Sequence, residues 1–300
     1  MTTRRDFLAA GAAAVTVSAF PALAAPVPKS KPKLRIAVKY GMIGIKGTPT
    51  DKFNAIKKLG FEGVEIDSPS NLKLDEVVAA TKETGILVHG VIDSVHWNDT
   101  LSHPNAEVRA KGLKALEGAL NDAKTVGADT VLLVPGVVNK DVTYEQCWER
   151  STAEVKKALP LAEKLKVKIA IETVWNNFIT KPQQMNDYVD QFKSEWVAAY
   201  FDISNMIKYG VPPAEWIRQL GKRLVKFDFK GYSTDLAKKS GKDGDGFKAK
   251  IGEGSEDWPE VLKALGEIGY DGWATSEVGG GDEKWLAEVA DRMKTVLGLK

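Results

Sequence analysis

The chain has 300 residues, of which 43% are hydrophobic and 27% charged, so it has the composition of a globular protein and enough length to bury a sizeable core. Its 42 basic and 40 acidic residues leave a formal charge of +2; without a long run of one sign, nucleic acid is not indicated as a partner. Cys147 is the single cysteine, which excludes an intramolecular disulfide and favours a buried thiol.

The first 25 residues have the pattern of a twin-arginine export signal. Arg4 and Arg5 precede an apolar run from Leu8 to Phe20, and Ala22-Leu23-Ala24 follows it as a cleavage site. A run of about a dozen residues is too short for a membrane-spanning helix, which needs ~20. We therefore expect a signal peptide over 1–25, a lead-in linker over 26–33, and a barrel domain over 34–300 that is periplasmic or otherwise exported, without stable membrane insertion.

From residue 34 onward, short β-branched runs alternate with longer segments of helical periodicity, a pattern that predicts a parallel sheet. Eight such units without a Gly-x-Gly-x-x-Gly motif favour a single closed (β/α)₈ TIM barrel over an open sheet. The predicted strands are Leu34–Val38, Gly63–Ile66, Leu87–Ile92, Thr130–Val134, Val167–Ile171, Val197–Phe201, Leu224–Phe229 and Gly272–Ser276. The predicted helices include Asp51–Leu59, Leu74–Thr84, Asn105–Val126, Tyr144–Leu165, Trp258–Ile268 and Lys284–Leu297.

Several helices are expected to end in a glycine that precedes the next strand by a few residues. Gly60, Gly127 and Gly269 occupy this place. Glycine adopts the left-handed conformation that stops a helix without a steric penalty. The repeated ending supports one continuous barrel without a second domain.

The last four predicted strands each end in an acid: Glu172, Asp202, Asp228 and Glu277. In barrels of this type the chemistry lies at the carboxyl ends of the strands. Buried charges need counter-charges, a metal or water, because burying them unpaired is costly. A structural salt-bridge network is one explanation, but four successive acidic strand ends favour a metal site.

Side-chain alternation along the seventh strand predicts which of its residues face the barrel interior. Val225, Phe227 and Phe229 form one apolar face that we expect to pack on the helices. Three charged residues alternate with them and are expected to point inward: Lys226, Asp228 and Lys230.

A set of short motifs carries a family resemblance over essentially the whole mature chain. It includes Gly60-Phe61-Glu62-Gly63-Val64-Glu65, Ser94-Val95-His96-Trp97, Leu101-Ser102-His103-Pro104, Ala170-Ile171-Glu172, Phe201-Asp202, Ile251-Gly252-Glu253-Gly254, Gly269-Tyr270-Asp271-Gly272 and Ser276-Glu277. Through these the sequence resembles the xylose-isomerase-like TIM-barrel family of sugar isomerases and epimerases.

The resemblance implies a divalent metal held by a glutamate, an aspartate, a histidine and a second glutamate, with the two glutamates moving protons. Glu172, Asp202 and Glu277 match the first, second and last ligand, and Asp228 stands in place of the histidine. Oxygen-only ligands favour Mn²⁺ or Mg²⁺ over Zn²⁺. Four carboxylates would leave a net charge near −2, so Lys226 or Lys230 compensates, Asp228 binds through water, or the site is altered.

The substrate-binding candidates implied beside these acids are His96, Trp97, Glu65, Lys230 and Asn205. For Glu65, a structural ion pair is as good an explanation as substrate contact. For His96, the alternative is that it is a loop histidine without a functional role. Asn205 replaces a histidine of several relatives. With only three histidines in the chain, the multi-zinc site of the related DNA-repair endonucleases cannot be assembled; His89 is expected in the core and His103 in a turn.

The expected function is an exported sugar isomerase or epimerase that transfers a proton next to a carbonyl through an enediolate, with Glu172 and Glu277 as the acid and base. The expected partner is a small sugar, and export favours a free or oxidised sugar over a phosphorylated one. The alternatives are a lyase or hydrolase of an oxidised (keto) sugar or glycoside and a non-catalytic sugar-binding barrel. The sequence leaves the oligomeric state open.

Overall fold

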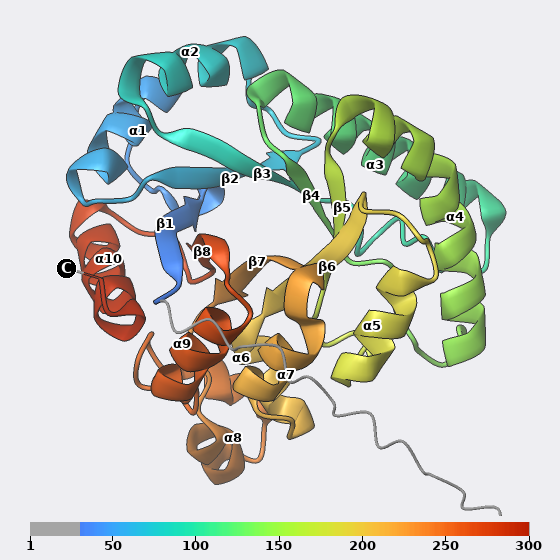
Figure 1. Cartoon of the computed structure of the whole chain (residues 1–300). Coiled ribbons are helices and arrows are strands. Elements are labelled where there is room, and N and C mark those ends of the chain that lie inside the picture. Colours follow the sequence, from blue (N-terminus) through green and yellow to red (C-terminus); the bar gives the residue numbers. More distant parts are fainter. Residues whose placement is uncertain (1–30, 300) are drawn as a thin grey trace, which may run out of the picture.

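Eight parallel strands close into a barrel in the computed structural model, which describes residues 31–299 (Figure 1). Each strand pairs with the next along the chain, and β8 closes the sheet against β1. The strands are β1 (Lys33–Lys39), β2 (Gly63–Ser68), β3 (Leu87–Asp93), β4 (Thr130–Leu133), β5 (Lys168–Glu172), β6 (Val197–Asp202), β7 (Leu224–Phe229) and β8 (Asp271–Ser276). The predicted (β/α)₈ barrel is confirmed.

Helices surround the barrel on its outer side (Figure 1). The α-helices are α1 (Pro49–Lys58), α2 (Leu74–Thr84), α3 (Ala106–Val126), α4 (Tyr144–Leu165), α5 (Pro182–Asp190), α6 (Ile203–Met206), α7 (Pro213–Leu220), α8 (Thr234–Ser240), α9 (Trp258–Glu267) and α10 (Glu283–Leu297). Short 3₁₀ helices are η1 (Tyr40–Met42), η2 (Ile207–Tyr209), η3 (Gly221–Arg223) and η4 (Asp243–Lys248).

The predicted export signal and most of the predicted lead-in lie outside the described residues. The first strand begins at Lys33, one residue before the predicted start. Within residues 31–299, no helix has both the length and the apolar character needed to cross a membrane.

The three glycines predicted to stop helices have the expected backbone conformation. Their φ angles are +92° at Gly60, +81° at Gly127 and +68° at Gly269. Side chains with a Cβ rarely adopt this left-handed region. The stops bring each following strand back to the sheet within a few residues, which keeps the strand ends on one face of the barrel.

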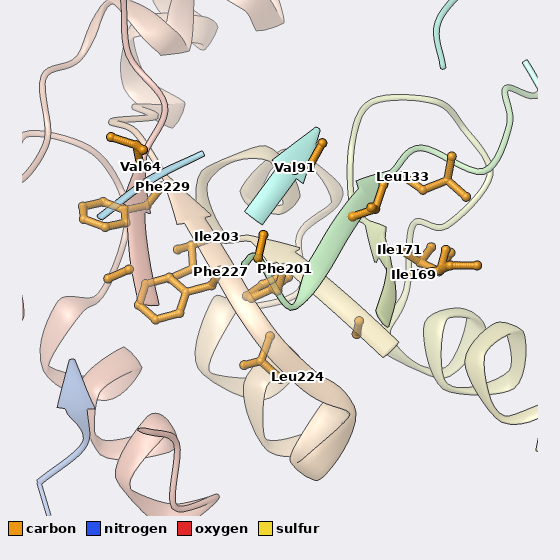
Figure 2. Packing of buried hydrophobic residues seen from close by; sticks show 14 of the residues in the cluster. Val64, Val91, Leu133, Ile169, Ile171, Phe201, Ile203, Leu224, Phe227 and Phe229 are labelled. Atoms are coloured by element: carbon orange, nitrogen blue, oxygen red, sulfur yellow. The ribbon is translucent and has the colours of Figure 1, made fainter. Parts of the chain in front are cut away.

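The barrel has two hydrophobic cores, one on each side of its wall. The larger core lies between strands and helices and includes Ile169 of β5, Phe201 of β6 and Phe227 of β7 (Figure 2). Leu132 and Ala170 belong to a small cluster of three residues on the other side of the wall, inside the barrel. This small interior core leaves the space above it to polar side chains.

The prediction that Val225 shares a face with Phe227 and Phe229 is wrong. Ala199 pairs with Leu224 but Tyr200 pairs with Lys226, so the register skips Val225. A bulge of this kind turns one residue to the other face. Val225 therefore packs against the interior cluster, while Asp228 stays opposite Asp202 near the carboxyl ends of β6 and β7.

Candidate active site

Four acids meet at the carboxyl ends of strands β5 to β8. Glu172 ends β5, Asp202 ends β6, Asp228 lies near the end of β7, and Glu277 directly follows β8. Glu172, Asp228 and Glu277 each place one carboxylate oxygen within 4.8 Å of the other two. These three acids form a cluster with the spacing of a divalent-cation site, and Asp202 lies beside it.

Two lysine ammonium groups lie among these acids. Lys39 Nζ is 2.8 Å from Asp228 Oδ2 and 2.9 Å from Glu277 Oε1; the contact with Asp228 is an ion pair whose angle lies outside hydrogen-bond geometry. Lys230 Nζ is 2.6 Å from Asp202 Oδ2 and also donates a hydrogen bond to Glu277 Oε2. Lys230 was predicted as a counter-charge, whereas Lys39 was not predicted.

Asp202 has a structural partner in addition to Lys230. Its Oδ1 accepts a hydrogen bond of 2.7 Å from the backbone N–H of Asn205, so Asp202 is the N-cap of α6. Burial raises the pKa of Asp202 to about 7, although Lys230 opposes this shift. Asp202 therefore fixes the start of the loop after β6 and orients Lys230.

Tyr200 and Glu65 lie beneath the acid cluster. The Tyr200 hydroxyl is 2.9 Å from Glu65 Oε1 and also contacts Asp228 Oδ1. One hydroxyl has a single proton to donate, and burial together with the charge of Asp228 raises the pKa of Glu65 to about 8. Glu65 is thus neutral at pH 7 and supports Asp228 through Tyr200. It does not line the cavity.

Glu172 differs from the other three acids because its carboxyl group has no partner within residues 31–299. It neither accepts a hydrogen bond from them nor forms an ion pair with them. It is 5% exposed and lines the cavity. Burial and the charge of Glu277 raise its pKa well above the usual value. For Glu277, Lys39 and Lys230 outweigh the effect of burial and lower the pKa. The surroundings therefore shift the pKa values of the two glutamates in opposite directions.

A cavity of about 270 Å³ opens over the acids. His96, Trp97 and Asn205 line it together with Lys39 and Lys230. Because burial lowers the pKa of His96 to about 4, its ring is neutral at pH 7. Its Nδ1 accepts a 3.3 Å hydrogen bond from the backbone N–H of Val134, which leaves Nε2 as a donor. Trp97 is 49% exposed, an apolar surface at the mouth of the cavity.

A second, larger cavity of about 560 Å³ adjoins the first between the loops after β7 and β8. Lys230, Phe247 and Glu277 line both cavities. Trp285, at the start of α10, lines only the second, and its indole Nε1 donates a 2.8 Å hydrogen bond to the carbonyl oxygen of Gly279. The site therefore has a small lobe over the acids and a larger side lobe.

The remaining predicted residues lie away from the acids. Lys226 is deeper in the barrel and pairs with Asp129, with Nζ and Oδ1 2.6 Å apart. His89 is buried and stacks on Trp273 with ring centroids 4.5 Å apart. His103 accepts a hydrogen bond from the backbone of Asn105 in a turn. Of the two lysines considered as counter-charges, Lys230 is therefore the one at the site.

The fit of a divalent cation depends on the two ammonium groups. Both oxygens of Asp202, Asp228 and Glu277 already face a donor. Only the two oxygens of Glu172 lack one within residues 31–299. As the side chains stand, an ion would have to displace Lys39 and Lys230, so the acids have the spacing for a cation but the site as a whole does not fit one.

The chain belongs to the xylose isomerase-like TIM barrel family, whose model matches residues 53–296. The L-ribulose-5-phosphate 3-epimerase UlaE of Salmonella paratyphi A is 24% identical over 237 residues, which cover 74% of this chain and 79% of that protein.

Solved structures share the fold. The 3-keto-D-glucoside 4-epimerase YcjR from E. coli superposes with a TM-score of 0.74 at 18% identity, over 88% of this chain and 99% of that one. The IOLI protein, solved with a bound zinc atom, gives a TM-score of 0.72 at 17% identity, over 88% and 98% of the two chains.

Proposed function

We propose that the chain is an epimerase or isomerase of a free or oxidised sugar that moves a proton on a carbon next to a carbonyl group. The curated relative UlaE is a sugar 3-epimerase, and the family membership supports the same class of reaction. The observation that carries the proposal is that Glu172 and Glu277 border one cavity, where their surroundings shift their pKa values in opposite directions.

The proposed acid and base roles follow from these opposite pKa shifts. Two carboxyl groups whose pKa values are pushed apart provide one proton donor and one acceptor. Glu172 starts protonated and donates, whereas Glu277 starts ionised and accepts the carbon-bound proton. Bound substrate oxygens can accept some of the hydrogen bonds that Lys39 and Lys230 donate to Glu277. Glu277 then becomes a stronger base, because these two lysines lower its pKa. Reprotonation of the same carbon from the opposite side gives an epimer, and reprotonation of the adjacent carbon gives the isomer.

The substrate contacts proposed beside this pair come from His96, Trp97 and Asn205, which line the same lobe. Neutral imidazole and amide groups suit sugar hydroxyls, and the indole provides an apolar face. The oxygen ligands predicted Mn²⁺ or Mg²⁺ as the cofactor. Because an ion would have to displace Lys39 and Lys230, the proposed reaction assigns no step to a metal.

The test is solvent exchange. The purified protein is incubated in D₂O with a panel of ketoses and keto sugars, with and without added Mn²⁺, and deuterium incorporation at each carbon is followed by NMR. We expect exchange at one carbon, reduced about 10²- to 10⁴-fold in Glu172→Gln, because general acid–base catalysis is of that size. Lys226→Met, deep in the barrel, is the control. Undiminished exchange in Glu172→Gln would show that the proton carrier is misassigned, and binding without exchange would favour a sugar-binding barrel.

The side lobe supports a second candidate, a lyase or hydrolase of a keto glycoside. The lobe that holds the acids is only about 270 Å³, and the adjoining lobe is about twice as large. A glycoside could place its keto sugar over the acids and its second group beside Trp285. An enediolate next to a glycosidic bond can expel that group, so release of the aglycone from a 3-keto glycoside distinguishes this reaction from epimerisation.

We also propose that the chain is exported by the twin-arginine route. The support is the Arg4-Arg5 motif with its apolar run. N-terminal sequencing of the protein recovered from the periplasm tests it, with Arg4→Lys/Arg5→Lys as the variant expected to remain inside.

A further inference from the structure

We infer that the ammonium groups of Lys39 and Lys230 take the place of the divalent ion that the family resemblance implies, and that this site works on a sugar carbonyl without a metal. The role in the reaction rests on the proposed function. The absence of tight metal binding can be tested independently of it.

The positions of the two ammonium groups are those of a shared counter-ion. Lys39 bridges Asp228 and Glu277, and Lys230 bridges Asp202 and Glu277. Together they contact three of the four acids that would surround the ion. Both lysine side chains are largely buried, at 14% exposure for Lys39 and 16% for Lys230. Their ammonium groups are therefore a fixed part of the site.

An ion and these lysines exclude each other. A divalent ion such as Mg²⁺ lies about 2.1 Å from its oxygen ligands. Lys39 Nζ is 2.8 Å from one oxygen of Asp228 and 2.9 Å from one of Glu277. An ion on those oxygens would therefore lie within about 5 Å of a buried positive charge. Lys39 would have to leave both of its partners before the ion could bind.

The departure from the family at Asp228 is explained by the same pair. A neutral histidine ligand offers a metal a nitrogen but gives an ammonium group no opposite charge. A carboxylate at this position forms an ion pair with Lys39, and Asp228 is completely buried. Asp228 and Lys39 come from β7 and β1, so we regard them as a matched replacement of histidine and metal.

The chemistry assigned to the lysines is stabilisation of the enediolate. Glu277 takes the proton from carbon, the C–H electron pair becomes the C=C bond, and the carbonyl π pair moves onto oxygen. Lys39 and Lys230 line the lobe where this oxygen would lie and can donate N–H groups to it. Charged donors in a buried site stabilise such an oxyanion strongly. Return of a proton from Glu172 to carbon restores the carbonyl, so the step needs no oxidant or reductant. Glu277 then loses its proton to solvent and Glu172 takes one up, which restores the starting state.

The binding test compares the wild-type chain with Lys39→Met/Asp228→His, which restores the family's histidine and removes the ammonium group. Each protein is stripped with a chelator, dialysed against MnCl₂ or ZnCl₂, and measured by elemental analysis and calorimetry. We expect less than one equivalent in the wild type and at least about tenfold tighter binding in the double variant, a change of one decade in Kd. Lys226→Met, which removes a buried lysine elsewhere in the barrel, should gain no metal. One tightly held equivalent in the wild type would overturn the inference.

Exchange measurements separate this inference from the proposed function. Deuterium exchange by the wild type that persists in a chelator supports metal-free catalysis, whereas exchange lost in the chelator and restored by Mn²⁺ contradicts it. If no sugar exchanges under either condition, the proposed function fails, and the binding comparison still decides whether the lysines replace the ion. Circular dichroism confirms folding of each variant; should the double variant not fold, the wild-type metal content alone decides.

Discussion

Glu172 is the residue whose surroundings set the chemistry of the site, because its carboxyl group is buried and has no donor among the described residues. Its pKa is raised by burial and by the charge of Glu277, and Lys39 opposes this shift. Removal of Lys39 must therefore raise the pKa of Glu172 further. The pKa of Glu172 on β5 therefore depends in part on Lys39 on β1.

We predict that Glu172 titrates above the ordinary glutamate range and that Lys39→Met moves its midpoint to higher pH. Carbon-13 NMR of labelled glutamate side chains measures this, with the signal assigned by its absence from Glu172→Gln. Lys226→Met should leave the midpoint unchanged, because Lys226 is not among the groups that shift Glu172. A midpoint that stays constant in Lys39→Met would contradict the assigned coupling.

At the residue scale, the acids could be predicted from the sequence but their partners could not. Glu172, Asp202, Asp228 and Glu277 each lie at or next to the carboxyl end of a strand, and that position alone brings acids together in a barrel. Lys39 closes β1 in the same way, which is the signal that could have identified it. Its choice of Asp228 and Glu277 depends on the closure of β1 against β8, which no local pattern contains.

At the element scale, the strands and long helices follow from periodicity, whereas bulges and short helices do not. The predicted strand ends agree with the structure to within about two residues, as expected of boundary assignments. The pairing between β6 and β7 determines that Val225 is skipped in the register and so which face of the sheet it occupies. The loops after β7 and β8 form the side lobe, and α10 contributes Trp285 to it. Loop conformation of this kind depends on tertiary contacts rather than on local sequence.

We predict that Trp285→Ala lowers kcat/KM for a keto glycoside about two- to tenfold more than for the free keto sugar, because aromatic contacts are worth about 0.5–1.5 kcal/mol. Trp285→Phe is the matched control: it keeps an aromatic ring and loses only the hydrogen bond to Gly279. Steady-state kinetics on the two substrates provide the measurement. Equal losses on both would mean that the side lobe does not bind the second group.

At the scale of the whole molecule, the barrel interior is a column of polar groups inside an apolar wall. Lys226 and Asp129 pair at its lower end, Glu65 and Tyr200 occupy the middle, and the acids with their lysines lie at the top. A column of this kind is stable only while each group is neutral or paired. The stability of the fold is therefore linked to pH through ionisable groups in the barrel interior.

The stability of the fold should fall between pH 7 and pH 8. Burial raises the pKa of Glu65 to about 8, far above its value in the unfolded chain. A carboxyl group with a raised folded pKa stabilises the fold fully below its unfolded pKa, and this contribution is lost as pH rises through the folded value. Each such group lowers the free energy of unfolding by up to about 1.4 kcal/mol per pH unit in this range. His89 and His96 have lowered pKa values, so the unfolded chain binds more protons at them near pH 7. They oppose the trend only slightly, by about 0.1 kcal/mol each, because unfolded histidine is mostly neutral above pH 7.

Glu65→Gln isolates this contribution, because glutamine can still form a hydrogen bond with the Tyr200 hydroxyl and has no proton to lose. Urea unfolding at pH 7 and pH 8 should show a smaller decrease in the variant, by about 1 kcal/mol. Asp202, whose pKa is about 7, also loses its proton in this range. Part of the decrease in unfolding free energy therefore remains in both proteins. Glu65 and Asp228 share contact with one Tyr200 hydroxyl. If the variant loses as much stability as the wild type between pH 7 and pH 8, the titrating proton is carried by Asp228 and not by Glu65. The ion pair between Asp228 and Lys39 is then correspondingly weaker.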